Sequence, residues 1–348
     1  MESNQRRHMT KAPTISDLAQ AAGLSVATVD RVLHGRANVS DRALRRVVEA
    51  AERIGFRAAA LPAVQTARPS VRLGFVLHKG NQAFYRNFTR AIEDASQARS
   101  DVAVTADIRF SPSQGPEDFA RALREAAAEN DVIAGTSVNH PETDRTAAAI
   151  VAAGTPLFCL LNDFARAERQ AYFGLDNIRV GRIAGWMLAT QIRQAGKIAV
   201  FVGGTRWSGH VLRETGLRSY LREHAPQLAL LDAFVNLETR HVTYEATLEL
   251  LSRHADLRGI YVAGGGMEGA IAGLREMRPA GKVALVVNEL TEDSRAALAD
   301  RYVSLAIATP LEDLCRSAVD AMVRAARNDS PPAGQCFLDP RLYVPEMV

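Results

Sequence analysis

This chain of 348 residues is poor in cysteine and has no long apolar run. Its three cysteines, Cys159, Cys315 and Cys336, are scattered and contain no C-x-x-C pair, which argues against a disulfide framework and a zinc site. No apolar run approaches the length of a membrane span, and residues 1–11 are polar and basic rather than hydrophobic like a signal peptide. We therefore expect a cytoplasmic protein without a metal site.

Excess positive charge is confined to the N-terminal part of the chain. Residues 1–72 hold 12 Lys/Arg and 6 Asp/Glu, whereas the remaining residues hold 30 and 33. A local basic surplus is the electrostatic footprint of phosphate contact, although a solvated basic surface has the same composition. The length leaves room for two or three domains. Charge alone is thus only weak evidence for nucleic-acid binding.

Residues 14–56 have the spacing of a helix-turn-helix followed by a third helix. Thr14 predicts the N-cap of the first helix and Ser25 that of the second, while Gly23 stands where the turn needs a positive φ. We expect Ser40 to cap the third helix. The apolar residues expected to join these helices are Leu18, Leu24, Val29, Val32, Leu44, Val47, Val48, Ala51 and Ile54. The alternative interpretation is a small helical hairpin at the edge of another domain.

The rest of the chain predicts an α/β fold. Residues 57–72 contain two prolines and few bulky apolar side chains, as in a linker. Beyond them apolar strand-like runs, including one at 229–237, alternate with amphipathic helical runs, which indicates parallel sheets covered on both faces. About ten such units exceed one ordinary open sheet. We therefore predict two doubly wound lobes with a cleft, where ligands bind at the carboxyl ends of strands.

The N-terminal stretch resembles the DNA-binding head of the lactose-repressor (LacI) family of bacterial transcription factors. This resemblance rests on the run from Asp17 to Val29, on Arg31-Val-Leu33, Val39-Ser40 and Gly55-Phe56. The remainder resembles the family's periplasmic-binding-protein-like sensor domain, with local signatures at 174–181 and 213–216. The resemblance implies a ligand-responsive transcriptional regulator, most often a repressor, that carries out no catalysis and needs no cofactor.

The resemblance also implies four segments and a homodimer. We expect a disordered N-terminus (1–13), a helix-turn-helix DNA-binding domain (14–57), a hinge (58–71) and a two-lobed ligand-sensing and dimerisation domain (72–348). Paired helix-turn-helix units place two recognition helices in successive major grooves of a palindromic operator in double-stranded DNA. An effector that closes the two lobes would reorient the dimer and its heads.

Three residues of the second helix fall where the family reads bases. Arg31 can donate two hydrogen bonds to guanine, whereas Val26 and Ala27 offer only apolar contact. The alternative for Arg31 is a surface salt bridge with a neighbouring aspartate. The residues expected to bind DNA through bases or phosphates are Thr14, Ser25, Val26, Ala27, Thr28, Arg31, His34 and Asn38.

Three positions depart from the family pattern. Asp30 replaces a phosphate-contacting serine, and because a carboxylate cannot donate to phosphate, we expect it to orient Arg31 instead. The stretch at 62–65 lacks the leucine that wedges into the minor groove in the family. Gly264-Gly265 replaces the sensor's usual Asn-Asp pair.

The resemblance nominates a set of effector-binding residues in the cleft. Aromatic side chains there could stack on a sugar ring, or simply pack in the core, and polar ones could bind hydroxyls or a carboxylate. The set is Phe84, Tyr85, Asp176, Trp207, Arg213, Asn288 and Glu289. Residues 304–309 lack the acid and glutamine of many sugar-binding relatives. We therefore expect a sugar, polyol or sugar acid rather than an ordinary aldose.

A different class of function stays open at this point. Residues 264–269 satisfy G-x-G-x-x-G after an apolar strand, and Glu289 follows at the distance of a ribose-binding acid. Alone, this pattern would indicate an NAD-linked oxidoreductase. It lies late in the chain, without a catalytic set nearby, and a glycine-lined cleft floor explains it equally well. A transport binding protein fits the sensor fold but not the DNA-binding head.

Overall fold

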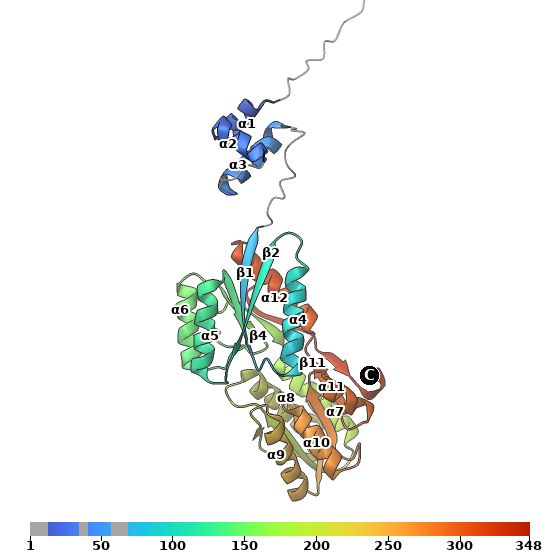
Figure 1. Ribbon diagram of the computed structural model, residues 1–348. Coiled ribbons are helices and arrows are strands. Elements are labelled where there is room, and N and C mark those ends of the chain that lie inside the picture. Colours follow the sequence, from blue (N-terminus) through green and yellow to red (C-terminus); the bar gives the residue numbers. More distant parts are fainter. Residues whose placement is uncertain (1–12, 35–40, 57–68) are drawn as a thin grey trace, which may run out of the picture. The chain divides into compact units, whose positions relative to one another are not determined.

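The chain divides into two compact units, Met1–Ser70 and Val71–Val348 (Figure 1). The computed structural model describes residues 13–34, 41–56 and 69–348. The expected DNA contact Asn38, the expected cap Ser40 and the segment 62–65 lie outside these residues.

The first unit is the predicted helix-turn-helix with its third helix. Its helices are α1 (Ile15–Ala22), α2 (Val26–Leu33) and α3 (Asp41–Ile54). Thr14 caps α1 in a reciprocal capping box, and Ser25 caps α2 by accepting a hydrogen bond from the Thr28 N–H at 3.2 Å. Gly23 ends α1 in the left-handed region, with φ at 60°. Buried apolar side chains from all three helices form one small core.

The first lobe of the second unit is built on a parallel sheet with strand order β12-β5-β4-β3-β1-β2. Neighbouring strands from β12 to β1 pair in parallel. Its elements are β1 (Ser70–His78), α4 (Ala83–Gln97), β2 (Ala103–Ser111), α5 (Pro116–Glu129), β3 (Val132–Gly135), α6 (Pro141–Ala152), β4 (Leu157–Leu160), β5 (Ala171–Leu175), α12 (Leu311–Ala326) and β12 (Gly334–Leu338).

The second lobe has a sheet with strand order β13-β11-β10-β9-β6-β7, and β8 also pairs with β6. Its elements are α7 (Asn177–Gln191), β6 (Gly196–Val202), α8 (Ser208–His224), β7 (Leu228–Leu230), β8 (Phe234–Val235), α9 (Arg240–Arg253), β9 (Leu257–Val262), α10 (Met267–Met277), β10 (Ala284–Asn288), α11 (Glu292–Ala299), β11 (Leu305–Ala308), β13 (Arg341–Tyr343) and the short 3-10 helix Pro345–Met347.

Helices cover both faces of each sheet, so each lobe has two apolar cores. In the first lobe α4 and α12 cover one face, and α5 and α6 cover the other (Figure 1). In the second lobe α7 and α8 cover one face, and α9, α10 and α11 the other. The predicted fold of two doubly wound lobes is thus confirmed.

The chain passes between the lobes three times. It crosses from β5 to α7, returns from β11 to α12, and crosses again from β12 to β13. The first lobe is therefore completed by residues near the end of the chain, and α12 packs beside α4 (Figure 1). A unit connected in this way can open and close about the three crossings.

Two details differ from the sequence prediction. The run at 229–237 forms two short strands, because only Leu228–Leu230 and Phe234–Val235 pair with β6, while the intervening stretch contains Asp232. The second lobe also contains a strand that was not predicted, β13, which pairs antiparallel with β11 at the edge of the sheet. A short connection from the first lobe brings this last strand back in the opposite direction.

Candidate functional site

A cavity lies between the two lobes of the second unit, with about 790 Å³ of empty space that is partly open to solvent. It gathers residues that follow strands β1, β4, β8, β9 and β10 or begin the next helix. This is the expected place for a ligand, because the carboxyl ends of parallel strands meet at one edge of a sheet. The predicted effector residues that line it are Phe84, Tyr85, Trp207, Arg213, Asn288 and Glu289.

Asp176 lies outside this lining, unlike the other six predicted effector residues. Its carboxylate caps α7 by accepting a hydrogen bond from the Arg179 N–H at 3.1 Å. It borders a different surface hollow, together with Arg182 and Trp186. The resemblance to the family did not distinguish a capping aspartate from one that faces the cleft.

Several turns around the cavity have left-handed backbones at residues other than glycine. Such conformations cost about 1–3 kcal/mol each and gather at ligand clamps and switch regions. The residues with positive φ that adjoin the cavity are Lys79 (49°), Leu161 (63°), Leu237 (50°), Glu238 (54°) and Glu289 (74°). The sharp turns at these residues direct the polar side chains that follow the strand ends toward the cavity.

The two lobes contact each other across the mouth of the cavity through the backbone of Leu237 and Glu238. The Lys79 ammonium donates to the carbonyl oxygens of Leu237 at 2.9 Å and Glu238 at 3.1 Å. Gln82 Nε2 donates to the Glu238 carbonyl at 3.2 Å, and Gln114 Nε2 to the Leu237 carbonyl at 3.1 Å. All three donors belong to the first lobe, so this turn of the second lobe is held in the closed arrangement.

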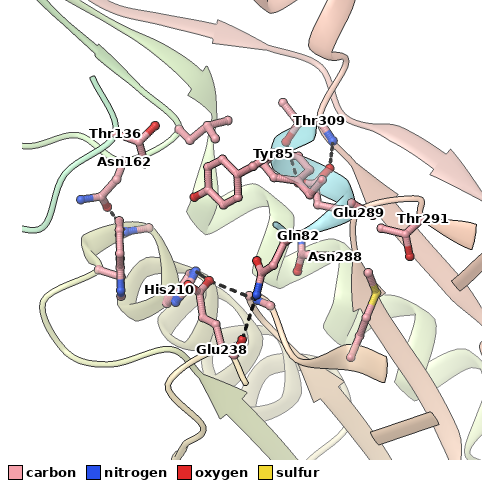
Figure 2. A pocket seen from close by; sticks show the side chains of 18 of the residues that line it. Gln82, Tyr85, Thr136, Asn162, His210, Glu238, Asn288, Glu289, Thr291 and Thr309 are labelled. Carbon is pink, nitrogen blue, oxygen red and sulfur yellow. Dashed lines mark hydrogen bonds and ion pairs between the residues drawn. The ribbon is translucent and has the colours of Figure 1, made fainter. Parts of the chain in front are cut away.

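The Glu238 carboxylate has a cation and donor groups close by, of which His210 is seen in Figure 2. Lys79 Nζ lies 3.4 Å away, His210 Nε2 3.6 Å, and the Gly265 N–H donates at 3.2 Å. Burial raises the pKa of Glu238, but His210, Lys79 and the Gly265 N–H reverse that effect and hold the pKa below its usual range. Glu238 is therefore a buried, charged group.

Two histidines beside Glu238 are buried and uncharged at neutral pH. Burial lowers the pKa of His78 and of His210 to about 4, and the nearby negative charge of Glu238 offsets only part of that effect. His210 Nδ1 accepts a hydrogen bond from the Gly203 N–H at 3.0 Å, which leaves its proton on Nε2, facing Glu238. Neither ring nitrogen of His78 has a hydrogen-bond partner among the described residues, although its Nε2 lies 4.0 Å from a Glu238 oxygen.

Glu289 and Arg213 also line the cavity. Thr309 donates its N–H to one Glu289 oxygen at 2.9 Å and its hydroxyl to the other at 2.7 Å. Burial raises the pKa of Glu289, although the Thr309 hydrogen bonds and the charge of Arg213 counteract it. Arg213 donates to Asn177 Oδ1 and to the Ala263 carbonyl, each at 2.7 Å. Both side chains are thus fixed before any ligand binds.

Glycines at a helix crossing place Arg213 in the cavity. A Cβ at Gly181 of α7 would lie 1.9 Å from the Arg213 carbonyl oxygen, and one at Gly216 of α8 would lie 2.1 Å from the Ile178 carbonyl oxygen. The two backbones are therefore in direct contact. These glycines belong to the two sensor signatures at 174–181 and 213–216. Close packing of the two helices therefore explains why glycine occurs in both signatures.

The glycine run at 264–269 does not have a free phosphate cradle. The Gly265 N–H is bonded to Glu238, and a Cβ at Gly264 would lie 2.4 Å from the His210 ring. Glu268, in the first turn of α10, places a carboxylate where the helix N-terminus would otherwise attract an anion. Close packing accounts for the glycines, and the carboxylates disfavour a dinucleotide pyrophosphate.

Sequence reasoning missed Glu238, His210, Glu268 and Thr309. Glu238 directly follows the end of the predicted strand 229–237, and an acid at a strand end was the available signal. His210 and Glu268 each lie in the first turn of a helix that starts at the cavity. Thr309 depends on its pairing with Glu289 from the neighbouring strand, which spacing along the chain does not reveal.

A second candidate surface lies on α2 of the first unit. Of the predicted DNA-binding residues, Thr28 is half-buried, and the exposed ones are Thr14, Ser25, Val26, Ala27, Arg31 and His34. Ser25 and Thr28 hydroxyls lie 2.8 Å apart, and the Asp30 carboxylate lies 3.1 Å from His34 Nδ1. The buried residues of α2 are Val29, Val32 and Leu33, so its opposite face is available to a partner.

Residues 13–34, 41–56 and 69–348 contain no group of three or more His, Cys, Asp and Glu that could hold a metal ion. The helices among these residues are each too short or too polar to cross a membrane.

Comparison with solved structures identifies the fold of the second unit. A solute-binding protein of an ABC transporter from Agrobacterium vitis, solved with alpha-D-tagatopyranose, matches with a TM-score of 0.74 at 19% identity, over 79% of this chain and 95% of that one. A periplasmic solute-binding protein from Actinobacillus succinogenes, solved with D-allose, matches with a TM-score of 0.72 at 16% identity, over 80% and 98%.

Sequence relatives connect both units to bacterial regulators. Catabolite control protein A of Priestia megaterium is 35% identical over 81 residues, 23% of this chain and only 24% of that protein. HTH-type transcriptional regulator GalS of Salmonella typhimurium is 24% identical over 266 residues, 76% of this chain and 75% of that protein. Residues 73–330 match the family described as periplasmic binding protein domain, and residues 14–58 match bacterial regulatory proteins, lacI family. The chain belongs to the lacI family of bacterial regulatory proteins, with a periplasmic binding protein domain as its larger part.

Proposed function

We propose that this protein is a sequence-specific DNA-binding transcriptional regulator whose DNA affinity is controlled by a small hydroxylated effector. The observation that carries the proposal is the presence, in one chain, of a lacI-type helix-turn-helix and a two-lobed unit with a polar cavity. It acts in the cytoplasm as a repressor and homodimer on a palindromic operator. It performs no catalysis and requires no cofactor.

The exposed face of α2 supports the DNA part of the proposal. Arg31 offers a bidentate donor to guanine, and Val26 offers an apolar contact to a thymine methyl. Thr14, Thr28 and His34 can donate to phosphate oxygens. We assign DNA binding to residues 14–57, hinge function to residues 58–71, and ligand sensing and dimerisation to residues 72–348.

The cavity supports the effector part of the proposal. It combines aromatic faces with carboxylate, guanidinium and hydroxyl groups, as in sites that bind small polyhydroxylated molecules. Two structural neighbours of the same fold were solved with sugars. We assign effector contacts to Phe84, Tyr85, Trp207, Arg213, Asn288 and Glu289, and to Glu238 and Glu268 in addition.

Lobe closure links the two activities. An effector that binds the closed form more tightly than the open form shifts the population by that difference in affinity. The Lys79, Gln82 and Gln114 hydrogen bonds to residues 237–238 are the contacts that such an effector would reinforce. Closure then changes the spacing of the two heads in the dimer, and with it the affinity for the operator.

Selection of binding sites from random double-stranded DNA tests the proposal. We expect a palindromic consensus, a dimer by light scattering, and salt-dependent affinity. A thermal-shift panel of sugars, polyols, sugar acids, NAD and NADP should contain a hydroxylated ligand that stabilises the full chain and changes DNA affinity. Binding of NAD that is lost in Glu289→Ala, without specific DNA binding, would favour the oxidoreductase alternative instead.

A further inference from the structure

The cavity carries more negative than positive charge. Its lining contains three carboxylates, Glu238, Glu268 and Glu289, and a single guanidinium, Arg213. Glu238 is compensated by Lys79, whose ammonium lies 3.4 Å away. Arg213 acts on Glu289, whereas no cation of the cavity lining acts on Glu268. One negative charge in the cavity is therefore left without an internal counter-charge.

Glu268 is the uncompensated group. No side chain in the described chain forms a hydrogen bond or an ion pair with it, and its own backbone N–H is its hydrogen-bond partner. Burial raises the pKa of Glu268 and nearby Asp293 raises it further, while Arg240 and Lys79 act in the opposite direction from beyond ion-pair distance. A half-buried carboxylate of this kind is stabilised when a cation or strong donor approaches it.

Arg213 cannot serve as that cation without leaving its present partners. Its Nε and Nη1 atoms donate to Asn177 Oδ1 and to the Ala263 carbonyl, each at 2.7 Å. These bonds tie it to α7 and to the end of β9. The Glu289 oxygens accept one hydrogen bond each from Thr309, so each retains a free lone pair.

Tyr85 is an independent sign that a polar ligand belongs here. Its side chain is 8% exposed, and its hydroxyl has no hydrogen-bond partner in the described chain. Figure 2 shows this hydroxyl pointing into the cavity, away from helix α4. The negative charges of Glu238 and Glu289, in addition to burial, raise the pKa of Tyr85, so both carboxylates act on the space in front of it. With Phe84 and Trp207 it adds aromatic surface, which attracts cations.

We propose that the effector is a hydroxylated molecule with a protonated amine, that Glu268 binds this ammonium group, and that Glu289 and the Tyr85 hydroxyl bind its hydroxyl groups. This inference rests on the proposed function and specifies the effector's charge. The amine donates to the Glu268 carboxylate, which accepts no hydrogen bond from a side chain of the described residues. The hydroxyls bind Tyr85 and the Arg213 N–H groups that are not used by Asn177 and Ala263. A sugar acid would place a second anion beside these carboxylates.

Two series of matched probes test this inference on the full-length chain at neutral pH and constant ionic strength. The first is tris(hydroxymethyl)aminomethane, pentaerythritol and bis(hydroxymethyl)propionate, which share one branched shape and differ in charge. The second is D-glucosamine, D-glucose and D-glucuronate. We expect the ammonium member of at least one series to bind about tenfold more tightly than the neutral member, since hydrogen bonds to charged groups contribute about 1.5–3 kcal/mol.

Two variants assign the preference to the cavity. Glu268→Gln keeps the shape of the side chain and removes its charge, so the ammonium preference should fall about tenfold. Glu245→Gln removes an exposed carboxylate from α9, outside the cavity, and should leave the preference unchanged. Calorimetry gives the affinities, and thermal midpoints without ligand verify that both variants fold.

The inference is wrong if no ammonium member binds more tightly than its neutral counterpart, or if the preference survives in Glu268→Gln. A neutral sugar or a sugar acid that binds and alters DNA affinity would leave the proposed regulator standing and overturn only the charge assignment. Ammonium-selective binding by a protein that has no specific DNA site would support the charge assignment and overturn the proposed regulator.

Discussion

Arg31 is the side chain on the exposed face of α2 best suited to read a base. If it contacts guanine, Arg31→Ala should cost about 1–3 kcal/mol of binding free energy and relax the preference at one symmetric pair of operator positions. Arg31→Lys is the matched control, because it keeps the charge and loses the two-pronged geometry. Fluorescence anisotropy with single-base operator variants measures both effects, and unchanged affinity and preference would remove Arg31 from the reading surface.

Asp30 brings a negative charge to the same helix. Its carboxylate lies 3.1 Å from His34 Nδ1, one turn along α2. We expect Asp30→Ser to tighten binding to specific and non-specific DNA alike, because it removes repulsion from phosphate and restores a donor. Asp30→Ala separates the two causes, since it removes the charge without adding a donor. A loss of affinity in Asp30→Ser would instead mean that Asp30 organises Arg31 or His34 for reading.

Individual site residues differ in how far the sequence predicts them. The family resemblance nominated Phe84, Tyr85 and Glu289, and all three line the cavity. Glu238 was missed although it follows a strand end, because the spacing along the chain does not reveal its ion pair with Lys79, which is 159 positions away and in the other lobe. Asp176 has the right location along the chain, yet the direction of its side chain is set by the cap it makes.

Helices α7 and α8 cross with their backbones in direct contact. Gly216→Ala would place a Cβ 2.1 Å from the Ile178 carbonyl oxygen, so the helices must separate. We expect the free energy of unfolding to fall by about 1–3 kcal/mol. Effector affinity should fall as well, because Arg213 lies one turn earlier on α8.

Denaturant unfolding and calorimetry check this prediction. Thr215→Ala is the matched control, since that side chain is exposed and its hydroxyl bonds only within α8, to the Val211 carbonyl at 2.8 Å. Equal stability of Gly216→Ala and Thr215→Ala would show that the two helices can move apart at no cost, contrary to the close contact described above.

The order of elements follows from the sequence where helix and strand patterns are long. The helix Pro116–Glu129 and the strand Ala171–Leu175 have clear local signals, because the helix has an apolar period, the strand is a continuous apolar run, and each has a Pro, Gly or Asp at an end. The split of 228–235 into β7 and β8 depends on which residues can reach β6, so it is decided by the sheet rather than by local pattern. Pairing between strands that are distant along the chain cannot be predicted from the local pattern of one sequence.

At the scale of the whole molecule, buried histidines at the closed cleft make stability depend on pH. His78 and His210 have a pKa of about 4 in the folded protein, against 6.5 in the unfolded chain. Between these values the unfolded chain binds protons that the folded protein does not, so the free energy of unfolding falls as pH falls from about 6.5 to about 4, by up to about 3 kcal/mol for each histidine. Loss of the Glu238 charge adds to this fall at lower pH.

Glu268 and Glu289 act with the opposite sign, because a raised carboxyl pKa favours the folded state as pH falls. Urea unfolding across this pH range measures the balance. In His78→Phe, which keeps an aromatic ring among Tyr85, Phe119 and Trp207, the slope should be shallower. The control His241→Gln alters an exposed histidine of α9 and should retain the original slope. An unchanged slope in His78→Phe would show that this histidine can be protonated without opening the structure.

The late position of β12 has a consequence for biosynthesis. β5 pairs with β12 along its full length, from Ala171 with Gly334 to Leu175 with Leu338. While the nascent chain is on the ribosome, β5 is an open sheet edge until roughly 150 further residues have been made, about 10–30 s at about 5–20 residues per second. An unpaired edge of this kind invites pairing with other chains. Slow translation or a stall within the second lobe should therefore increase aggregation of this protein.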